Sequence, residues 1–223
     1  MTPTRITGAL LVSALLSSCG DSTGPGAGPS AKVSDPSGDT YGSDSVKWDV
    51  TAMTISRDTS AVTVRLDFSS NPISPVSGDS NAMLGFVEFD TDQDSTTGFL
   101  TAVDQFRPAP GSTGMGAEYR LDLATYAPDS TTLVLDTLGT PTGSVRPVFH
   151  GKSVTIRIPL ALLGGATALN AAAIVGTRAS PSDIIPENGH LHLGPSALAG
   201  SSSAGAARAE SGRRPMPPAP PRW

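Results

Sequence analysis

The stretch 61-AVTVRLDF-68 alternates apolar and polar residues over most of its length. Positions 62, 64, 66 and 68 are Val, Val, Leu and Phe, and they fall on one face of an extended chain. This period of two predicts a strand that is buried on one side. The pattern recurs in 118-EYRLDL-123 and 153-SVTIRIPL-160. All three segments therefore need an apolar layer against their buried faces.

Other strand candidates lie between turns, in a chain with 24 Gly and 20 Pro. In 46-VKWDVTAMTI-55 the apolar positions change phase, which predicts a β-bulge, with Trp48 in the core. Four further candidates, several of them apolar on both faces, are 83-MLGFVEF-89, 131-TTLVLDT-137, 145-VRPVF-149 and 170-NAAAIVGT-177. The main helical signal is the short 159-PLALLGG-165. This arrangement predicts an all-β fold, an antiparallel, jelly-roll-like β-sandwich.

The N-terminus has a basic residue, Arg5, and then an apolar run over residues 6–16 that is too short to span a bilayer. It predicts a secretory signal peptide at residues 1–18. The sequence 16-LSSC-19 contains the single cysteine of the chain and resembles the lipobox of bacterial lipoproteins. That resemblance implies a lipid anchor such as palmitate on Cys19 and a place in the cell envelope, periplasmic or on the cell surface. The alternative is an ordinary signal peptide with an incidental cysteine.

The regions that flank the predicted domain are rich in small residues and proline. We expect residues 19–32 to form a flexible tether, residues 33–197 the β-sandwich, and residues 198–223 a disordered basic tail. The tail could contact anionic lipid or the acidic domain, be solvated without a partner, or reflect a misassigned chain end. The chain carries a net charge of −5, and an acidic domain disfavours nucleic-acid binding.

An acidic loop, 89-FDTDQDSTTG-98, follows one of the strand candidates directly. Carboxylates on alternate positions repel one another unless a cation lies among them, and hard oxygen ligands suit calcium. The spacing is not that of an EF-hand, because Ser95 stands where the glycine belongs and Thr101 where the glutamate belongs. Two interpretations remain. One is a calcium loop with Asp90, Asp92, Asp94 and the Thr96 carbonyl as ligands; the other is a solvated acidic turn.

Five motifs follow one another in the order 35-DPSGDTYGSDSVKWDVTAMTIS-56, 86-FVEFDTDQDSTTG-98, 116-GAEYRLDL-123, 154-VTIRIPLALLGG-165 and 180-SPSDIIPENGHL-191. This order resembles family 9 carbohydrate-binding modules and the wider DOMON-like group. The resemblance implies an extracytoplasmic sandwich that binds sugars or haem, with calcium as a common structural ion. It also implies that Asp35, Asp39, Asp183 and Glu187 complete the ion loop or form a second site. The alternative for these four residues is local turn chemistry.

Carbohydrate-binding modules of this kind stack aromatic rings on the sugar, but only 5% of this chain is aromatic. Tyr41 and Tyr126 lie in predicted loops and are the candidate ligand contacts; half-buried filler is the alternative for both. A haem interpretation needs an axial pair such as Met53 or Met83 with His150. His190 and His192 have the spacing of two metal ligands, without the third or fourth that zinc needs.

No catalytic constellation is visible in the sequence. The segment 151-GKS-153 lacks the upstream glycine of a phosphate-binding loop and precedes a strand. The sequence therefore predicts a membrane-anchored, extracytoplasmic β-sandwich binding module without enzymatic activity, stabilised by calcium and contacting carbohydrate or another envelope polymer. The alternatives are a haem-binding or degenerate-enzyme accessory domain, and a purely scaffolding lipoprotein.

Overall fold

Ala61–Phe68 forms β3, the central strand of a five-stranded antiparallel sheet. The computed structural model describes residues 28–127 and 129–195. The strand order in this first sheet is β1 (Ser30–Ser34), β2 (Val50–Arg57), β3, β9 (Ser153–Pro159) and β8 (Val148–His150). The predicted bulge in β2 is present as a register shift between Val50 and Ala52.

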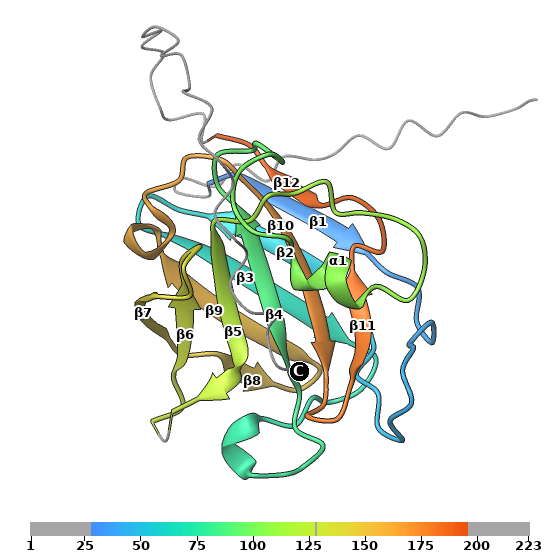
Figure 1. Ribbon diagram of the computed structural model, residues 1–223. Coiled ribbons are helices and arrows are strands. Elements are labelled where there is room, and N and C mark those ends of the chain that lie inside the picture. The colour runs from blue at the N-terminus through green and yellow to red at the C-terminus, as the bar shows by residue number, and fades with distance from the viewer. Residues whose placement is uncertain (1–27, 128, 196–223) are drawn as a thin grey trace, which may run out of the picture.

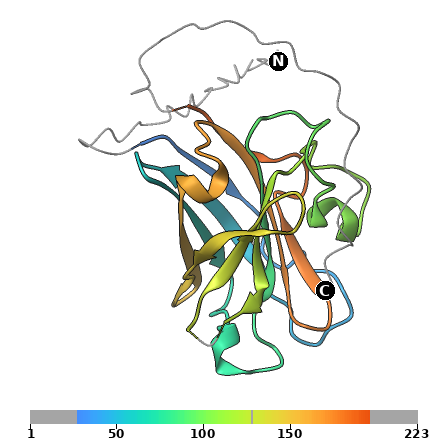
Figure 2. The same cartoon turned by 60° about the vertical axis from the view of Figure 1, so that its left-hand side comes forward.

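A second antiparallel sheet, with seven strands, packs face to face with the first (Figures 1 and 2). Its main path is β11 (Pro181–Ile185), β10 (Leu169–Gly176), β4 (Leu84–Asp90), β5 (Tyr119–Tyr126), β6 (Thr132–Leu135) and β7 (Pro141–Val145). The short β12 (Leu191–Leu193) also pairs with β10. The protein is therefore an antiparallel β-sandwich, as the sequence predicts.

The main core lies between the two sheets and contains the inward residues of both. Leu66 of β3 and Ile156 of β9 meet Phe89 of β4 and Leu121 of β5 in one apolar cluster that is fully shielded from solvent. Trp48 is also buried there, and its indole Nε1 donates to the carbonyl oxygen of Asn81 at 3.1 Å. Burial of each large apolar side chain stabilises the fold by about 2 kcal/mol.

A short helix, α1 (Ala102–Phe106), covers part of the outer face of the second sheet. β10 is therefore buried on both faces, which explains why its sequence is apolar throughout. Under α1, the buried carboxylate of Glu88 accepts hydrogen bonds from the backbone amides of Ala102 and Val103 and pairs with Arg120 at 2.8 Å. Two 3-10 turns, η1 (Pro75–Ser77) and η2 (Leu160–Leu163), complete the elements of the described residues.

Several predicted boundaries are wrong. Ser30–Ser34 forms β1, although residues 30–32 were assigned to the tether. The candidate 145-VRPVF-149 is not one strand, because β7 ends at Val145 and β8 begins at Val148, on either side of a proline that has no amide to donate. The α1 helix was not predicted. The signal peptide, Cys19 and the basic tail lie outside the described residues, and none of the helices in the described ranges is long and apolar enough to cross a membrane.

Candidate metal sites

Two groups of three carboxylates lie near opposite ends of β10. The rim group consists of Asp90, Asp92 and Glu118, and the clamp group of Asp35, Asp39 and Asp183. In each group, one oxygen atom from every residue lies within 4.8 Å of the others. The strand register explains where the two groups lie. Asp90 pairs with Asn170 at the start of β10, whereas Asp183 pairs with Val175 near its end.

The rim group forms where β4 ends and the chain turns. The carboxylate of Asp90 is buried; it accepts a hydrogen bond from the Gln93 amide at 2.6 Å and another from Asn170 Nδ2 at 3.0 Å. Burial raises the pKa of Asp90, and the neighbouring Asp92 raises it further. The tight loop also requires Gln93 in the left-handed region, at φ 61°.

The other two rim carboxylates share one hydroxyl. Thr97 Oγ1 lies 2.9 Å from Asp92 Oδ2 and 3.1 Å from Glu118 Oε1. Glu118 also accepts from the Thr91 amide at 2.7 Å. Burial raises the pKa of Glu118, and the charges of Asp92 and Asp90 raise it further. The three carboxylates are thus held by donors of the loop and its neighbours, in an arrangement that could offer oxygen ligands to a divalent cation.

Asp94, one of the predicted loop ligands, is not among the three carboxylates of the rim group. Asp94 Oδ1 instead accepts from the amide and the hydroxyl of Thr96, at 2.9 and 2.6 Å, and these bonds lower the pKa of Asp94. This is a local turn. Glu118 takes part in the group but was not predicted as a ligand, because the sequence shows it only as the first residue of a strand candidate.

The clamp group forms where the loop of residues 35–49 lies along β11. The Tyr41 amide donates to the Ser182 carbonyl at 2.9 Å, and Trp48 and Ser182 exchange two hydrogen bonds at 2.9 Å. Gly42 lies so close to β11 that a Cβ there would approach the Pro181 carbonyl oxygen to 2.5 Å. The loop therefore joins the edge of the second sheet to β1 and β2 of the first.

Asp183 projects from β11 into this junction. It is 3% exposed and accepts hydrogen bonds from the amides of Val50 at 2.7 Å and Ile184 at 2.9 Å. Burial, and secondarily the charge of Asp35, raises its pKa to about 8 in spite of these bonds. The sequence predicted turn chemistry as the alternative for Asp183, but the residue lies in a strand.

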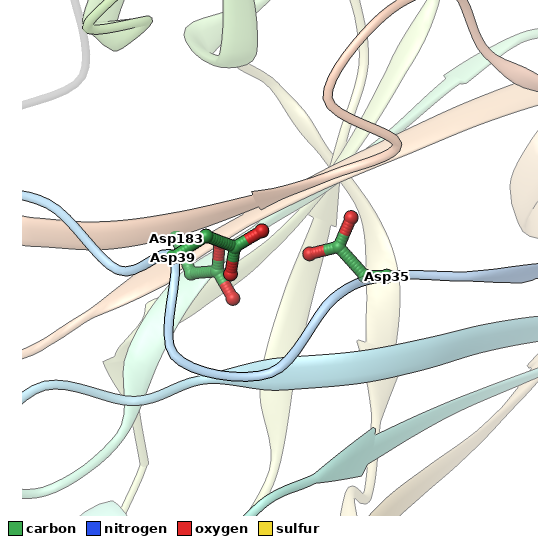
Figure 3. A group of neighbouring side chains, drawn as sticks. All are labelled: Asp35, Asp39 and Asp183. Carbon is green, nitrogen blue, oxygen red and sulfur yellow. The ribbon is translucent and has the colours of Figure 1, made fainter.

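Asp35 and Asp39 belong to the loop beside β11, and their carboxylates lie near that of Asp183, with Asp35 facing the other two (Figure 3). They flank a turn that Asp49 holds, because Asp49 Oδ2 accepts from the Ser37 hydroxyl at 3.0 Å and the Gly38 amide at 2.9 Å. Burial raises the pKa of Asp35 to about 7, with further contributions from Asp39, Glu187 and Asp49. Glu187 is exposed and lies near this group, although it is not one of the three carboxylates that meet.

The remaining predicted residues lie in separate environments. Tyr41 and Tyr126 are half-buried, each with a hydroxyl that is shielded from solvent. Met53 and Met83 are core residues, whereas His150 is exposed on β8. His190 and His192 make separate hydrogen bonds through Nδ1, to the Thr113 carbonyl at 2.8 Å and to Asn170 Oδ1 at 2.9 Å.

A polar depression of about 260 Å³ adjoins the rim group. It is bordered by Ser95 and Thr97 of the acidic loop, by Asp104 of α1 and by Ser112. Leu100, 52% exposed, forms part of its apolar wall. The depression is lined by both polar and apolar side chains, the kind of lining that contacts a small hydroxyl-rich group.

Comparison with known proteins adds no further assignment. The chain matches no protein-family model and no curated protein.

Proposed function

We propose that this chain is a lipid-anchored, extracytoplasmic binding module whose rim group holds a structural calcium ion and whose adjoining depression contacts carbohydrate or another envelope polymer. The observation that carries this proposal is the meeting of Asp90, Asp92 and Glu118 at the end of β4. Three carboxylate residues with free lone pairs form a ligand set of the kind that calcium accepts in its shell of six to eight oxygens.

The rim group also explains why the loop would depend on a cation. Burial raises the pKa of Glu118, and the charges of Asp92 and Asp90 raise it further, so these carboxylates repel one another. The acidic loop lies directly beside the depression, since Thr97 contacts the rim group and also lines the depression. A calcium ion would therefore fix the wall against which a polymer binds. The anchor rests on the lipobox resemblance around Cys19.

Calcium titration of the full chain by isothermal calorimetry tests the ion site. Asp92→Asn removes one exposed ligand charge and is expected to abolish binding at the rim group. Asp94→Asn is the matched control in the same loop, because Asp94 caps its own turn outside the group. At a calcium concentration a hundred times the dissociation constant, the ion adds about 2.7 kcal/mol of stability, which is a rise of several degrees in Tm. Unchanged binding in Asp92→Asn would reject the rim site.

A glycan and polymer binding screen with calcium and then with EDTA tests the second half of the proposal. Binding that requires calcium and is lost when Ser112 is replaced by a bulkier residue, Ser112→Trp, supports the depression as the contact. Ser201→Trp, in the predicted tail, serves as the control. Binding that is unaffected by Ser112→Trp places the polymer elsewhere on the protein.

A further inference from the structure

We propose that Asp35, Asp39 and Asp183 hold a second divalent cation, of the calcium class, which fastens the N-terminal segment of the sandwich to β11. This clamp site is separate from the rim group and does not rest on it. The three ligand oxygens come from two parts of the chain that are far apart in sequence and meet only in the folded structure (Figure 3).

An unsatisfied oxygen points to the cation. Asp35 Oδ2 is shielded from solvent and has no hydrogen-bond partner, and the same holds for Oδ1 of Asp49, which is 8% exposed. A buried oxygen without a donor loses its hydration and gains nothing in return. The rim group differs, because none of its oxygens is buried without a partner. At the rim, N–H and O–H donors partly take the place of a cation. The clamp group has an oxygen without any such donor and therefore lacks a positive partner.

The charged groups around the junction also favour a bound cation. Besides burial, the charges that raise the pKa of Asp35 are those of Asp39, Glu187 and Asp49. The charges that raise the pKa of Asp183 are those of Asp35 and Asp39, against the two backbone amides that lower it. Arg107, a basic side chain that acts on Tyr41, pairs with Asp104 at 3.5 Å. Burial and these charges raise the pKa of Asp35 and that of Asp183, so a cation at the junction would replace the protons that these two carboxylates otherwise favour.

The ligands are held in place before any ion binds. Two backbone amides fix the carboxylate of Asp183, and each of its oxygens keeps a second lone pair. The turn between Asp35 and Asp39 is fixed by Asp49. Three carboxylates on such a framework, completed by water, suit the flexible coordination of calcium better than the strict octahedron of magnesium.

A cation at the clamp site would stabilise the N-terminal end of the sandwich. β1 is an edge strand that pairs with β2 alone in its sheet, and the loop of residues 35–49 follows it directly. The predicted lipid anchor at Cys19 precedes β1 in the sequence. An ion that ties this loop to β11 would therefore secure the anchored end of the sandwich.

Calcium titration of the full chain and of three variants tests the proposal. Asp39→Asn removes a clamp ligand, and because Asp39 is exposed we expect the variant to fold. Asp44→Asn is the matched control in the same loop, since Asp44 bonds to Thr177 outside the group. Asp92→Asn reports on the rim group independently. We expect two calcium sites in the wild type, loss of one of them in Asp39→Asn with a fall of at least roughly tenfold in affinity, and no loss in Asp44→Asn.

The outcomes separate the two proposals. One remaining site in Asp39→Asn and one in Asp92→Asn supports both. A single wild-type site that Asp39→Asn removes and Asp92→Asn keeps supports the clamp and rejects the rim. A site count and affinity in Asp39→Asn equal to those of the wild type overturn the clamp, and an absence of calcium binding in the wild type overturns both. Limited proteolysis gives a second readout, because calcium should protect the loop of residues 35–49 in the wild type but not in Asp39→Asn.

Discussion

The rim group and the clamp group contain the same number of carboxylates but solve the problem of their repulsion differently. At the rim, an amide, an asparagine and a threonine hydroxyl donate to the acidic oxygens, and Asp92 is exposed to water. At the clamp, Asp183 is deeply buried and an oxygen of Asp35 has no donor. Both groups are assembled by folding, so the difference lies in the donors: the rim carboxylates receive N–H and O–H donors from the loop and its neighbours, whereas the clamp leaves an oxygen of Asp35 without one.

The largest expected difference in the free energy of unfolding is between a variant of a buried acid and a variant of an exposed acid. Asp183→Ala removes the acceptor of two buried amides, those of Val50 and Ile184, and should lower the free energy of unfolding by about 3 kcal/mol. Asp92→Ala should cost less than about 1 kcal/mol, because its carboxylate is solvated. Urea denaturation in calcium-free buffer measures both. Equal losses would mean that Asp183 does not hold the junction; if Asp183→Ala fails to fold, Asp183→Asn gives the same comparison.

The next effect is a dependence of stability on pH. The pKa of Asp35 rises from 3.8 to about 7 and that of Asp183 from 3.8 to about 8. The folded state therefore holds protons that the unfolded state has released. Without calcium, the free energy of unfolding should fall as pH rises from 4 toward 8, by about 2 kcal/mol after allowance for solvent screening, and level off above the folded pKa values. Asp90 and Glu118 act in the same direction.

Calcium should reverse this trend, because it binds the ionised carboxylates and competes with protons. The stabilisation by calcium should therefore be larger at pH 8 than at pH 6. Chemical denaturation at several pH values, with and without calcium, measures the difference. In Asp35→Asn the fall in stability between pH 4 and pH 8 should be much shallower than in Asp92→Asn. A slope that is the same in both variants would assign the pH dependence to other groups.

The strands were predictable because their periodicity is local. β3, β5 and β9 each alternate over their own length, and the β2 bulge is visible as a change of phase. The α1 helix has only five residues, too few for a helical period, and its signal is the single N-cap bond from the Asp104 amide to Thr101. Short elements of this kind are set by the sheet face that they cover.

The candidate sites were predictable only in part, for a related reason. The sequence indicated Asp90 and Asp92 as neighbours, but Glu118 reaches them because Phe89 pairs with Tyr119 across β4 and β5. Asp35 and Asp183 lie in two separate motifs, and only the family resemblance, not the local pattern, grouped them with Asp39 and Glu187 as a candidate acidic site. Their meeting depends on how the loop of residues 35–49 docks on β11, which periodicity does not encode.

One substitution at the clamp should raise the free energy of unfolding of the calcium-free protein instead of lowering it. Asp35→Asn removes the negative charge of a half-buried carboxylate that acts on Asp183, and in calcium-free buffer at pH 8 it should raise the free energy of unfolding by about 1 kcal/mol. Asp92→Asn at the rim should change it little. With calcium present, Asp35→Asn should gain less stability from the ion than the wild type does. A loss of stability in calcium-free buffer would show that the Asp35 carboxylate is already compensated.

The smallest effect concerns Asp94, the third acid of the alternating loop. Its carboxylate accepts two bonds from Thr96 within the turn, and hydrogen bonds of this local kind are each worth a fraction of a kcal/mol at an exposed site. Asp94→Asn should therefore cost about 0.5 kcal/mol in urea denaturation and leave the calcium affinity unchanged. A clear loss of calcium affinity would instead return Asp94 to the ligand set and restore the alternating motif as the determinant of the site. If the affinity is unchanged, the ligand set follows the pairing of β4 with β5, which brings in Glu118, and the regular spacing of the aspartates serves the turn.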